Sequence, residues 1–242
     1  MEMEAINKSN IIQPYASYFG GKAAAGVYHT IINNIPQHSV YIEAFLGNGT
    51  IMRIKKPCKL NIGIDKDSGL IDKYNYNSHG KNFIFVNGDF LILSNNSYNH
   101  LCCSKKTFIY ADPPYLHSTR KSANKYNHEL SIEEHIKLLE FANSCKCNIM
   151  LSCYDSKLYR DKLKNFNKIN FQGWSRGGKT IETIYMNYDL KTLHDTALVG
   201  KNFTDRQRIK RKVKREIEKL KKLGNQERQT IIDAINYEFR NK

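Results

Sequence analysis

The sequence of 242 residues contains no run of about 18 consecutive apolar residues, the length that a membrane-spanning helix needs. Its first five residues, Met-Glu-Met-Glu-Ala, include neither a basic nor an apolar stretch, so a secretory signal is not expected. The six cysteines form no Cys-x-x-Cys pair and have no histidine at zinc-ligand spacing, which predicts reduced thiols and no metal site. We therefore expect an intracellular protein, cytoplasmic or nucleoid-associated, with no membrane partner.

Acidic residues are few relative to basic ones, 23 against 38, which gives a formal net charge of +15. Residues 201–242 hold 14 basic and 6 acidic residues, a net of +8, which leaves 24 and 17, a net of +7, for the first 200. Such an imbalance is costly in self-repulsion and usually serves to bind a polyanion. Nucleic acid is the expected partner, and a merely solvated tail is the alternative.

The change of composition near residue 201 divides the chain into an expected domain, residues 1–200, and a basic helical extension, residues 201–242. Residues 204–207 match a capping box, and Gly224 separates two expected helices. Apolar residues recur along both at spacings of three and four: Ile209, Val213, Ile217, Leu220, Leu223, Ile231, Ile232, Ile235 and Phe239. This hairpin is compatible with docking on the domain, with dimerisation and with binding DNA through Arg208, Arg211, Lys212 and Arg215.

Short apolar runs, most of them followed at once by glycine or acidic residues, predict buried strands in the first 200 residues. They cover residues 40–43, 60–64, 82–86, 107–111 and 148–152. Residues 180–186 alternate and predict an antiparallel edge hairpin with residues 168–171. Residues 131–134 match a capping box that opens a helix with Ile132, His135, Ile136, Leu139 and Ala142 toward the sheet. The pattern predicts an α/β fold, a doubly wound and mostly parallel sheet whose strand ends share one rim.

Glycines and carboxylates at these strand ends predict a ligand site. Gly20 and Gly21 precede a run at residues 22–32 that predicts a helix, whose N-terminus suits an anion. Gly47 and Gly49 let backbone approach a ligand closely, but the third glycine of a dinucleotide fingerprint is lacking. Asp65 follows the next strand at the spacing that suits ribose hydroxyls, although a helix cap is an equal alternative for this acidic stretch.

The apolar run at residues 107–111 ends in Asp112-Pro113-Pro114-Tyr115. Proline cannot continue a sheet ladder, so the segment is held stiffly at the strand's carboxyl end, where ligands bind in such sheets. A simple strand-ending turn is the alternative. A basic loop at residues 116–127 and a glycine-rich turn at residues 172–179 could contact DNA. Their candidate contacts are Arg120, Lys121, Lys125, Trp174, Arg176 and Lys179.

Taken in order, the motifs at residues 18–22, 43–49, 64–67, 88–90 and 112–115 resemble the Dam-like DNA adenine N(6)-methyltransferases, which use S-adenosylmethionine. The resemblance runs from Tyr18 to about Asn187. It implies a class I methyltransferase fold, a Rossmann-like seven-stranded sheet whose last strand is antiparallel. It also implies that Asp65 binds the cofactor's ribose and Asp89 its adenine. The remaining cofactor-binding residues would be Tyr18, Gly20, Gly21, Lys22, Glu43, Phe45, Gly47 and Gly49.

The resemblance gives Asp112-Pro113-Pro114-Tyr115 the catalytic role. An adenine amino group is a poor nucleophile and needs acceptors for its hydrogens, which the Asp112 carboxylate and the Pro113 carbonyl can supply. Tyr115 offers a flat face to a base swung out of the duplex. No metal is required.

One departure concerns target recognition, since Gly49 and Asp112 are only 63 residues apart and leave no room for a recognition domain. Base readout would fall to the basic loops, to the extension, or to a homodimer or partner chain. The same chemistry on RNA adenine or on cytosine stays open as an alternative. So does a catalytically silent DNA-binding partner subunit.

Overall fold

The computed structural model describes residues 21–24, 26–77, 82–94, 96–120, 128–175 and 178–240. These residues form two compact units, one ending at Thr196 and the other beginning at Ala197. In the part of the chain that the structure describes, no helix combines the length and the apolar character needed to cross a bilayer.

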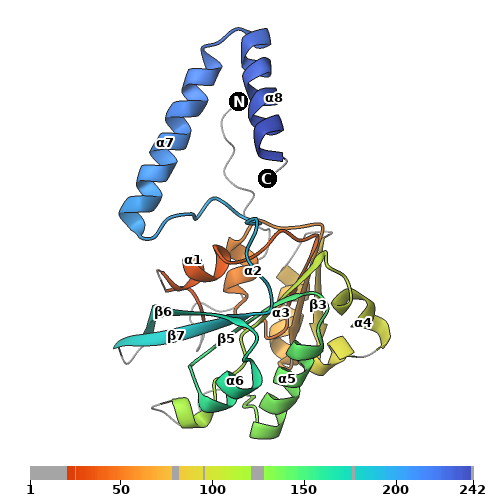
Figure 1. Ribbon diagram of the computed structural model, residues 1–242. Coiled ribbons are helices and arrows are strands. Elements are labelled where there is room, and N and C mark those ends of the chain that lie inside the picture. Colours follow the sequence, from red (N-terminus) through yellow and green to blue (C-terminus); the bar gives the residue numbers. More distant parts are fainter. Residues whose placement is uncertain are drawn as a thin grey trace. The chain divides into compact units, whose positions relative to one another are not determined.

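The first unit is built on one twisted sheet flanked by helices (Figure 1). The sheet has seven strands in the order β3-β2-β1-β4-β5-β7-β6. Its first five strands are mutually parallel, and β7 runs antiparallel to both β5 and β6. The strands are β1 (Val40–Glu43), β2 (Leu60–Asp65), β3 (Phe83–Asn87), β4 (Thr107–Ala111), β5 (Asn148–Cys153), β6 (Asn167–Ser175) and β7 (Gly178–Met186). This is the Rossmann-like, doubly wound class I methyltransferase sheet that was predicted, including the antiparallel last strand. The β6–β7 hairpin is longer than expected, and β6 forms the edge of the sheet.

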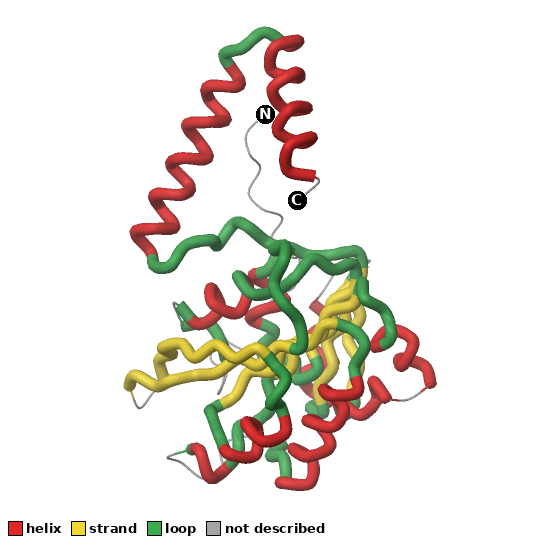
Figure 2. The backbone as a smooth tube through the Cα atoms, in the orientation of Figure 1, coloured by secondary structure: helices red, strands yellow, loops and turns green. Residues whose placement is uncertain are grey.

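Helices cover both faces of the sheet (Figure 2). They are α1 (Val27–Ile32), α2 (Thr50–Ile54), α3 (Ser68–Asn77), α4 (Asn96–Cys102), α5 (Ile132–Ser144) and α6 (Lys157–Lys162), with 3-10 turns η1 (Phe90–Ser94) and η2 (His117–Thr119). Helix α1 packs on α2, whereas α5 packs on α6 and η1. The strand order reverses direction after β3, as in doubly wound sheets that carry helices on both faces.

Two local predictions for these helices need correction. Helix α1 begins at Val27 rather than near Lys22, because Gly26 adopts φ of +95°, which no α-helix accommodates in its interior. The capping box of α5 is present, with Ser131 accepting from the Glu134 amide. However, Ile132 in its first turn is 61% exposed, and Leu138 takes a place in the core instead.

The core lies between the helices and the middle of the sheet. It is formed by the side chains that neighbouring strands direct to one face, among them Ile42, Ile62, Ile109, Ile149 and Leu151, all 0–2% exposed. Burying an aliphatic side chain of this size contributes about 1.5–3 kcal/mol. Because the strands share this packed layer, their carboxyl ends are fixed relative to one another.

Two buried histidines stack on each other in the first unit, and their burial predicts that acid destabilises the fold. The His38 and His194 rings stack with centroids 3.8 Å apart. Burial, reinforced by Lys55 and His194, lowers the pKa of His38 to about 3. Since the folded-state pKa lies below the ordinary value, stability is complete above about pH 6.5 and is lost as the pH falls toward 3.

We expect the free energy of unfolding, measured by urea denaturation, to be about 2 kcal/mol lower at pH 5 than at pH 7 through His38 alone. A His38→Phe variant keeps a ring in the same space and cannot take up the proton. Its stability should therefore change less between the two pH values than that of the native protein. Equal pH dependence in the two proteins would show that His38 is not the source.

The second unit contains α7 (Phe203–Lys221) and α8 (Asn225–Arg240), the helical hairpin that the sequence predicts. The two helices diverge from the turn that joins them (Figure 1). The predicted capping box at residues 204–207 is wrong, because Asn202 caps α7 by accepting from the Asp205 amide. Asparagine is as good an N-cap as threonine, and here it lies two residues earlier.

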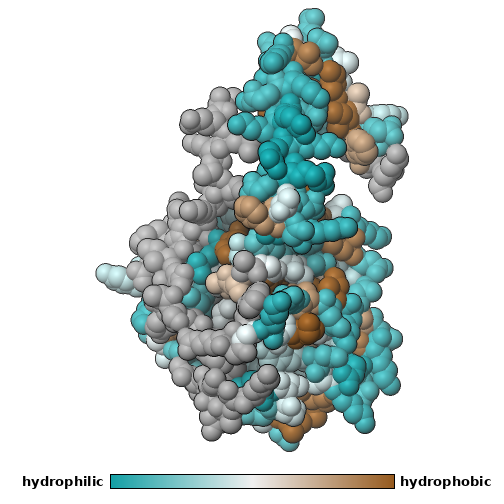
Figure 3. All heavy atoms as spheres, turned by 90° about the vertical axis from the view of Figure 1, so that its left-hand side faces the viewer, coloured by the Kyte–Doolittle hydropathy of each residue, from teal (hydrophilic) through white to brown (hydrophobic). Residues whose placement is uncertain are grey.

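Apolar side chains gather in a strip along this hairpin (Figure 3). Val213 and Ile235, which belong to the predicted stripe, are each 49% exposed within this unit. The opposite face of α7 and its C-cap Lys222 surround a shallow hollow, lined by Arg208, Arg211, Lys214, Arg215, Lys219, Lys222 and one acid, Glu218. The helix thus separates an apolar face from a strongly basic one.

Candidate active site

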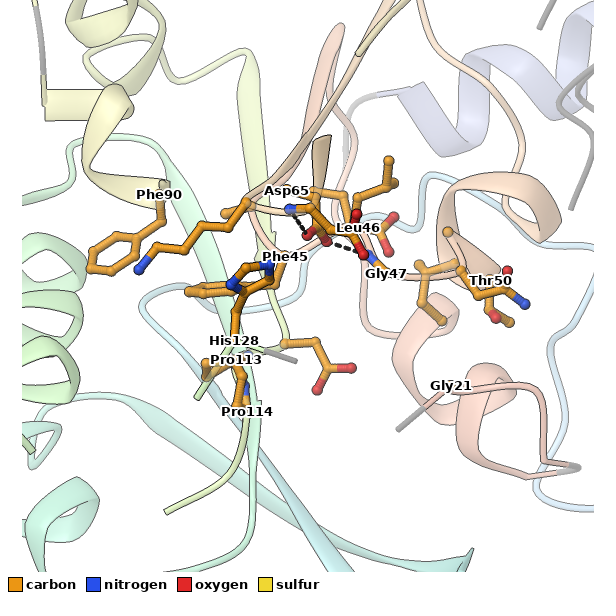
Figure 4. Close-up of a pocket in the computed structure, with 18 of the residues that line it drawn as sticks. Gly21, Phe45, Leu46, Gly47, Thr50, Asp65, Phe90, Pro113, Pro114 and His128 are labelled. Atoms are coloured by element: carbon orange, nitrogen blue, oxygen red, sulfur yellow. Dashed lines mark hydrogen bonds between the residues drawn. The ribbon is translucent and has the colours of Figure 1, made fainter. Parts of the chain in front are cut away.

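The carboxyl ends of β1, β2, β3 and β4 meet around one pocket, as expected for a shared rim (Figure 4). The space within it, including the part open to solvent, is about 920 Å³. Its walls are formed by Gly21, Lys22, residues 43–51, residues 65–67, Gly88, Phe90, residues 112–114, His128 and Leu130. Segments that are far apart in the sequence therefore provide one continuous lining.

The turn after β1 keeps one wall of the pocket free of side chains. Gly47 and Gly49 have φ of +48° and +55°, values that L-residues with side chains rarely adopt. A Cβ added to Gly49 would lie 2.4 Å from the Tyr74 hydroxyl, which donates to the Gly47 carbonyl. Glycine is required at this point both for the turn and for the room that Tyr74 takes.

Asp65 lies at the end of β2, and backbone amides hold its carboxylate in place. One oxygen accepts from the Gly47 amide at 2.8 Å and the other from the Asp67 amide at 3.0 Å (Figure 4). Burial raises the pKa of Asp65, and the two amides oppose that effect. Asp67 is the residue that caps α3, since its side chain accepts from the Leu70 amide. The sequence left a ribose contact and a helix cap open for this acidic stretch. Asp67 provides the cap, and Asp65 keeps further lone pairs that can accept from a ligand.

Glu43, at the end of β1, is buried at the floor of the pocket. Its Oε2 accepts from the Tyr41 hydroxyl at 2.8 Å and from the Met52 amide at 3.0 Å. Burial raises the pKa of Glu43 to about 8, and the charge of Asp112 raises it further. The side chain is therefore largely neutral at pH 7 and can donate a hydrogen bond.

Asp112, at the end of β4, is held by a buried ammonium group. The Lys22 Nζ lies 3.0 Å from the Asp112 Oδ1, and the two side chains are 8% and 15% exposed. Burial raises the pKa of Asp112 to about 6, although Lys22 opposes this rise. Lys22 also donates to the Tyr115 hydroxyl at 2.6 Å, and its Nζ lies over the Tyr115 ring, 4.7 Å from the centroid. The two parts of the Asp-Pro-Pro-Tyr segment expected to meet a base are thus bridged by one lysine.

Asp89 does not line the pocket, although its neighbours Gly88 and Phe90 do. Its Oδ1 accepts from the Leu91 amide at 2.9 Å, and its Oδ2 pairs with Lys66 Nζ at 2.6 Å. Lys66 also pairs with Glu134 at the start of α5. Both oxygens of Asp89 are therefore engaged within the protein.

The predicted DNA contacts fall into different parts of the chain. Arg120 is not at an open surface: its side chain is 7% exposed and forms a bidentate pair with Glu129 at 3.0 and 2.7 Å. Lys179 lies on β7 and is exposed, as are Arg208, Arg211, Lys212 and Arg215 on α7. Trp174 belongs to β6. Tyr18, Gly20, Lys121, Lys125 and Arg176 lie outside the described residues.

Several residues of the site were missed by the sequence reasoning. His128 lines the pocket near Asp65, whose carboxylate it stabilises electrostatically. Glu182 on β7 accepts from the Tyr115 hydroxyl at 3.1 Å, and Ser152 on β5 lies 3.2 Å from the same hydroxyl. A carboxylate on an inward position of the predicted β7 was the available signal for Glu182. None existed for His128.

The pocket fits the S-adenosylmethionine that the resemblance implies. Asp65 presents fixed acceptors for ribose hydroxyls, and Phe45, Leu46 and Phe90 supply apolar surface. The glycine turn admits a ligand close to the backbone. Asp112 and Pro113 line the same pocket, so a group bound beside them would reach the cofactor.

Comparison with known proteins gives one family. Residues 81–176 match the family model described as D12 class N6 adenine-specific DNA methyltransferase. A comparison with curated protein sequences finds no match.

Among solved structures, TrmK of M. capricolum in complex with S-adenosyl-homocysteine is 9% identical, with a TM-score of 0.46, over 88% of this chain and 94% of that one. An rRNA methylase from Streptococcus thermophilus is 14% identical, with a TM-score of 0.41, over 68% and 95%. A dimethyladenosine transferase from Plasmodium falciparum is 15% identical, with a TM-score of 0.43, over 66% and 60%. At such distances the fold assignment rests on the strand order of the sheet itself.

The family match covers the segment from β3 through Asp112-Pro113-Pro114-Tyr115 to the end of β6. It confirms the predicted resemblance, and with it a methyltransferase that uses S-adenosylmethionine. Over residues 81–176 the chain is therefore similar to the D12 class N6 adenine-specific DNA methyltransferases.

Proposed function

We propose that this methyltransferase modifies the exocyclic N6 amino group of an adenine flipped out of DNA. The observation that carries the proposal is that Asp112 and Pro113 lie on the pocket that fits the cofactor. An amino-group acceptor and a methyl donor would then meet in one space. The family match and the basic surface of α7 support adenine and DNA as the target.

The chain's own residues would orient the amino group and stabilise the positive charge that develops on it. S-adenosylmethionine, when bound, supplies a methyl group activated by its sulfonium. The Asp112 carboxylate and the Pro113 carbonyl accept the two N6 hydrogens, which turns the nitrogen lone pair toward that methyl group. As the methyl carbon bonds to N6, its bond to sulfur breaks and the electron pair of that bond stays on sulfur. The nitrogen becomes positive, and one of its protons is released to Asp112 and then to solvent. The pKa of about 6 suits Asp112 to that transient role.

Residues 1–200 are the part to which we assign methyl transfer, and residues 201–242 the part to which we assign DNA binding. Helix α7 contains nine basic and three acidic residues, a net formal charge of +6, and its polar face is exposed. Phosphate contacts from such a face give affinity without sequence selection. Target recognition would rest on the loops beside the pocket or on a partner chain.

The direct test is transfer of a labelled methyl group from S-adenosylmethionine to DNA, followed by digestion of the product to nucleosides. Label found in N6-methyl-2′-deoxyadenosine supports the proposal. Label only in cytosine, or transfer only to RNA, would favour the same chemistry on another target. A protein that binds cofactor and DNA without any transfer would be a silent partner subunit, which the buried Lys22–Asp112 pair argues against.

Replacing Asp65 with alanine should weaken S-adenosylmethionine binding by roughly 10- to 100-fold, because charge-assisted hydrogen bonds to the ribose are lost. Isothermal titration calorimetry measures this directly. Asp72→Ala is the matched control, since Asp72 is exposed on α3, does not line the pocket and should leave cofactor affinity nearly unchanged. If both variants bind the cofactor like the native protein, the ribose does not lie at Asp65.

A further inference from the structure

Lys22 occupies the place that a target base needs. Its ammonium group lies 3.0 Å from the Asp112 carboxylate and, at 4.7 Å from the centroid, over the Tyr115 ring. Asp112 is the acceptor that the proposed function assigns to adenine, and Tyr115 carries the flat face that the sequence analysis assigns to it. A base cannot use both while the ammonium group stays between them, so Lys22 must shift when the base enters.

Moving this ammonium group away from every carboxylate would be costly. The Lys22 side chain is only 8% exposed, and breaking a buried ion pair leaves a charge without compensation. A second anionic acceptor close to the first would remove most of that cost, because the ammonium group could then change partner without crossing water.

Glu182 on β7 is such an acceptor. Its Oε2 lies 3.5 Å from the Lys22 Nζ and accepts from the Tyr115 hydroxyl at 3.1 Å. The residue is 7% exposed, so its carboxylate is directed into the protein rather than toward solvent. Lys22, Asp112 and Tyr115 are thus all within reach of one further buried acid.

The neighbouring strand β6 leaves room for this carboxylate. A Cβ added to Gly173 would lie 2.6 Å from Glu182 Oε1 and 3.1 Å from its Cδ. Glycine inside a strand is unfavourable unless something packs against the bare backbone, and here the Glu182 side chain does so. The sheet is therefore shaped around the position of this acid.

We propose that Glu182 is a positioning residue that receives the Lys22 ammonium group when the target base takes its place on Asp112 and Tyr115. The proposal rests on the proposed function, because it assumes that a base binds there. No bond is made or broken in this exchange of ion pairs. Glu182 does not touch the base or the cofactor and acts through Lys22 and Tyr115.

Glu182→Gln keeps the shape of the side chain and removes its charge. We expect kcat/KM for methyl transfer to fall by roughly 10- to 100-fold, the value of one charge-assisted contact, with calorimetric affinity for S-adenosylmethionine unchanged. The acid limb of the kcat/KM profile should also move to lower pH. The groups around Asp112 are Lys22, Glu43, Tyr115 and Glu182, and the charge of Glu182 raises the pKa of Asp112, so its removal lowers that pKa.

Gly173→Ala is a second variant that displaces the carboxylate without removing its charge. It should also lower kcat/KM, and in the Glu182→Gln background it should add little, because both act on one contact. Thr180→Ala, at the position paired with Gly173, is the control and should leave kcat/KM near the native value. Melting temperatures of all variants separate this effect from unfolding.

Native protein that transfers no methyl group would overturn the proposed function itself. An active native protein whose Glu182→Gln variant keeps its kcat/KM and an unshifted acid limb would overturn the role of Glu182 alone. A loss of kcat/KM with no shift of the limb would also count against it, because a purely structural contact gives that result.

Discussion

Replacing Asp112 with alanine is expected to lower the rate of methyl transfer by roughly 10²- to 10³-fold while cofactor binding persists. The carboxylate is the acceptor that we assign to the N6 hydrogens, and its removal leaves developing positive charge without a partner. It also leaves the Lys22 ammonium group with Glu182 as its nearest carboxylate, 3.5 Å away. The assay is transfer of labelled methyl groups at saturating cofactor and DNA.

Asp112→Asn is the closer test, because the amide keeps the volume of the carboxylate and loses its charge. In the native protein, burial raises the pKa of Asp112 to about 6, so the ionised fraction and the rate should fall as the pH drops below that value. The asparagine variant should show a low rate and no such acid limb. Transfer at the native rate in either variant would remove Asp112 from the mechanism.

Neutralising the basic face of α7 should cause the second large effect. Changing Arg208, Arg211, Lys214 and Arg215 together to glutamine is expected to weaken DNA binding and to flatten its dependence on salt. Each phosphate contact contributes about 0.9 to the slope of log K against log salt, so four contacts should lower that slope by about 3 to 4. Fluorescence anisotropy at several salt concentrations measures both quantities.

A matched control exists in the first unit. Four lysines of this unit are exposed: Lys105, Lys106, Lys146 and Lys164. The first three lie just before β4 and β5, at the amino ends of these strands, whereas the pocket lies at the carboxyl ends. Their change to glutamine lowers the net charge by the same amount. If this control flattens the salt dependence as much as the α7 variant, overall charge and not the α7 face governs binding.

The parallel strands and the shared position of their carboxyl ends could be predicted because each strand has a recognisable local sequence pattern. The run at residues 107–111 is uniformly apolar, and the prolines after Asp112 mark its end. Parallel pairing then dictates that Gly47, Asp65 and Asp112 lie on the same edge. The pocket assembled from those ends follows from topology alone.

Side-chain partners across the sheet could not be predicted in the same way. Lys22 and Asp112 are 90 residues apart, and the sequence around either residue does not indicate that the two form an ion pair. The alternating pattern of residues 180–186 indicated on which face of the sheet Glu182 lies, but not which residues it contacts. The start of α1 was misplaced because Ala23 and Ala24 favour a helix, whereas the backbone at Gly26 excludes one. Arg120 was taken for a surface residue because its pairing with Glu129 depends on how the loop folds back.

The insertion of β7 between β5 and β6 decides when the site can become complete during synthesis. Until residues 178–186 emerge, β5 has one unpaired edge with a buried-type sequence, and Tyr115 lacks Glu182. Because β6 lies at the end of the sheet and pairs with β7, the two strands add to the free edge of β5 as one hairpin, and the β5–β7 pairing joins segments about 30 residues apart. A nascent chain that has already folded its glycine turn and its Asp112 segment can thus form the cofactor pocket before Glu182 reaches Lys22 and Tyr115.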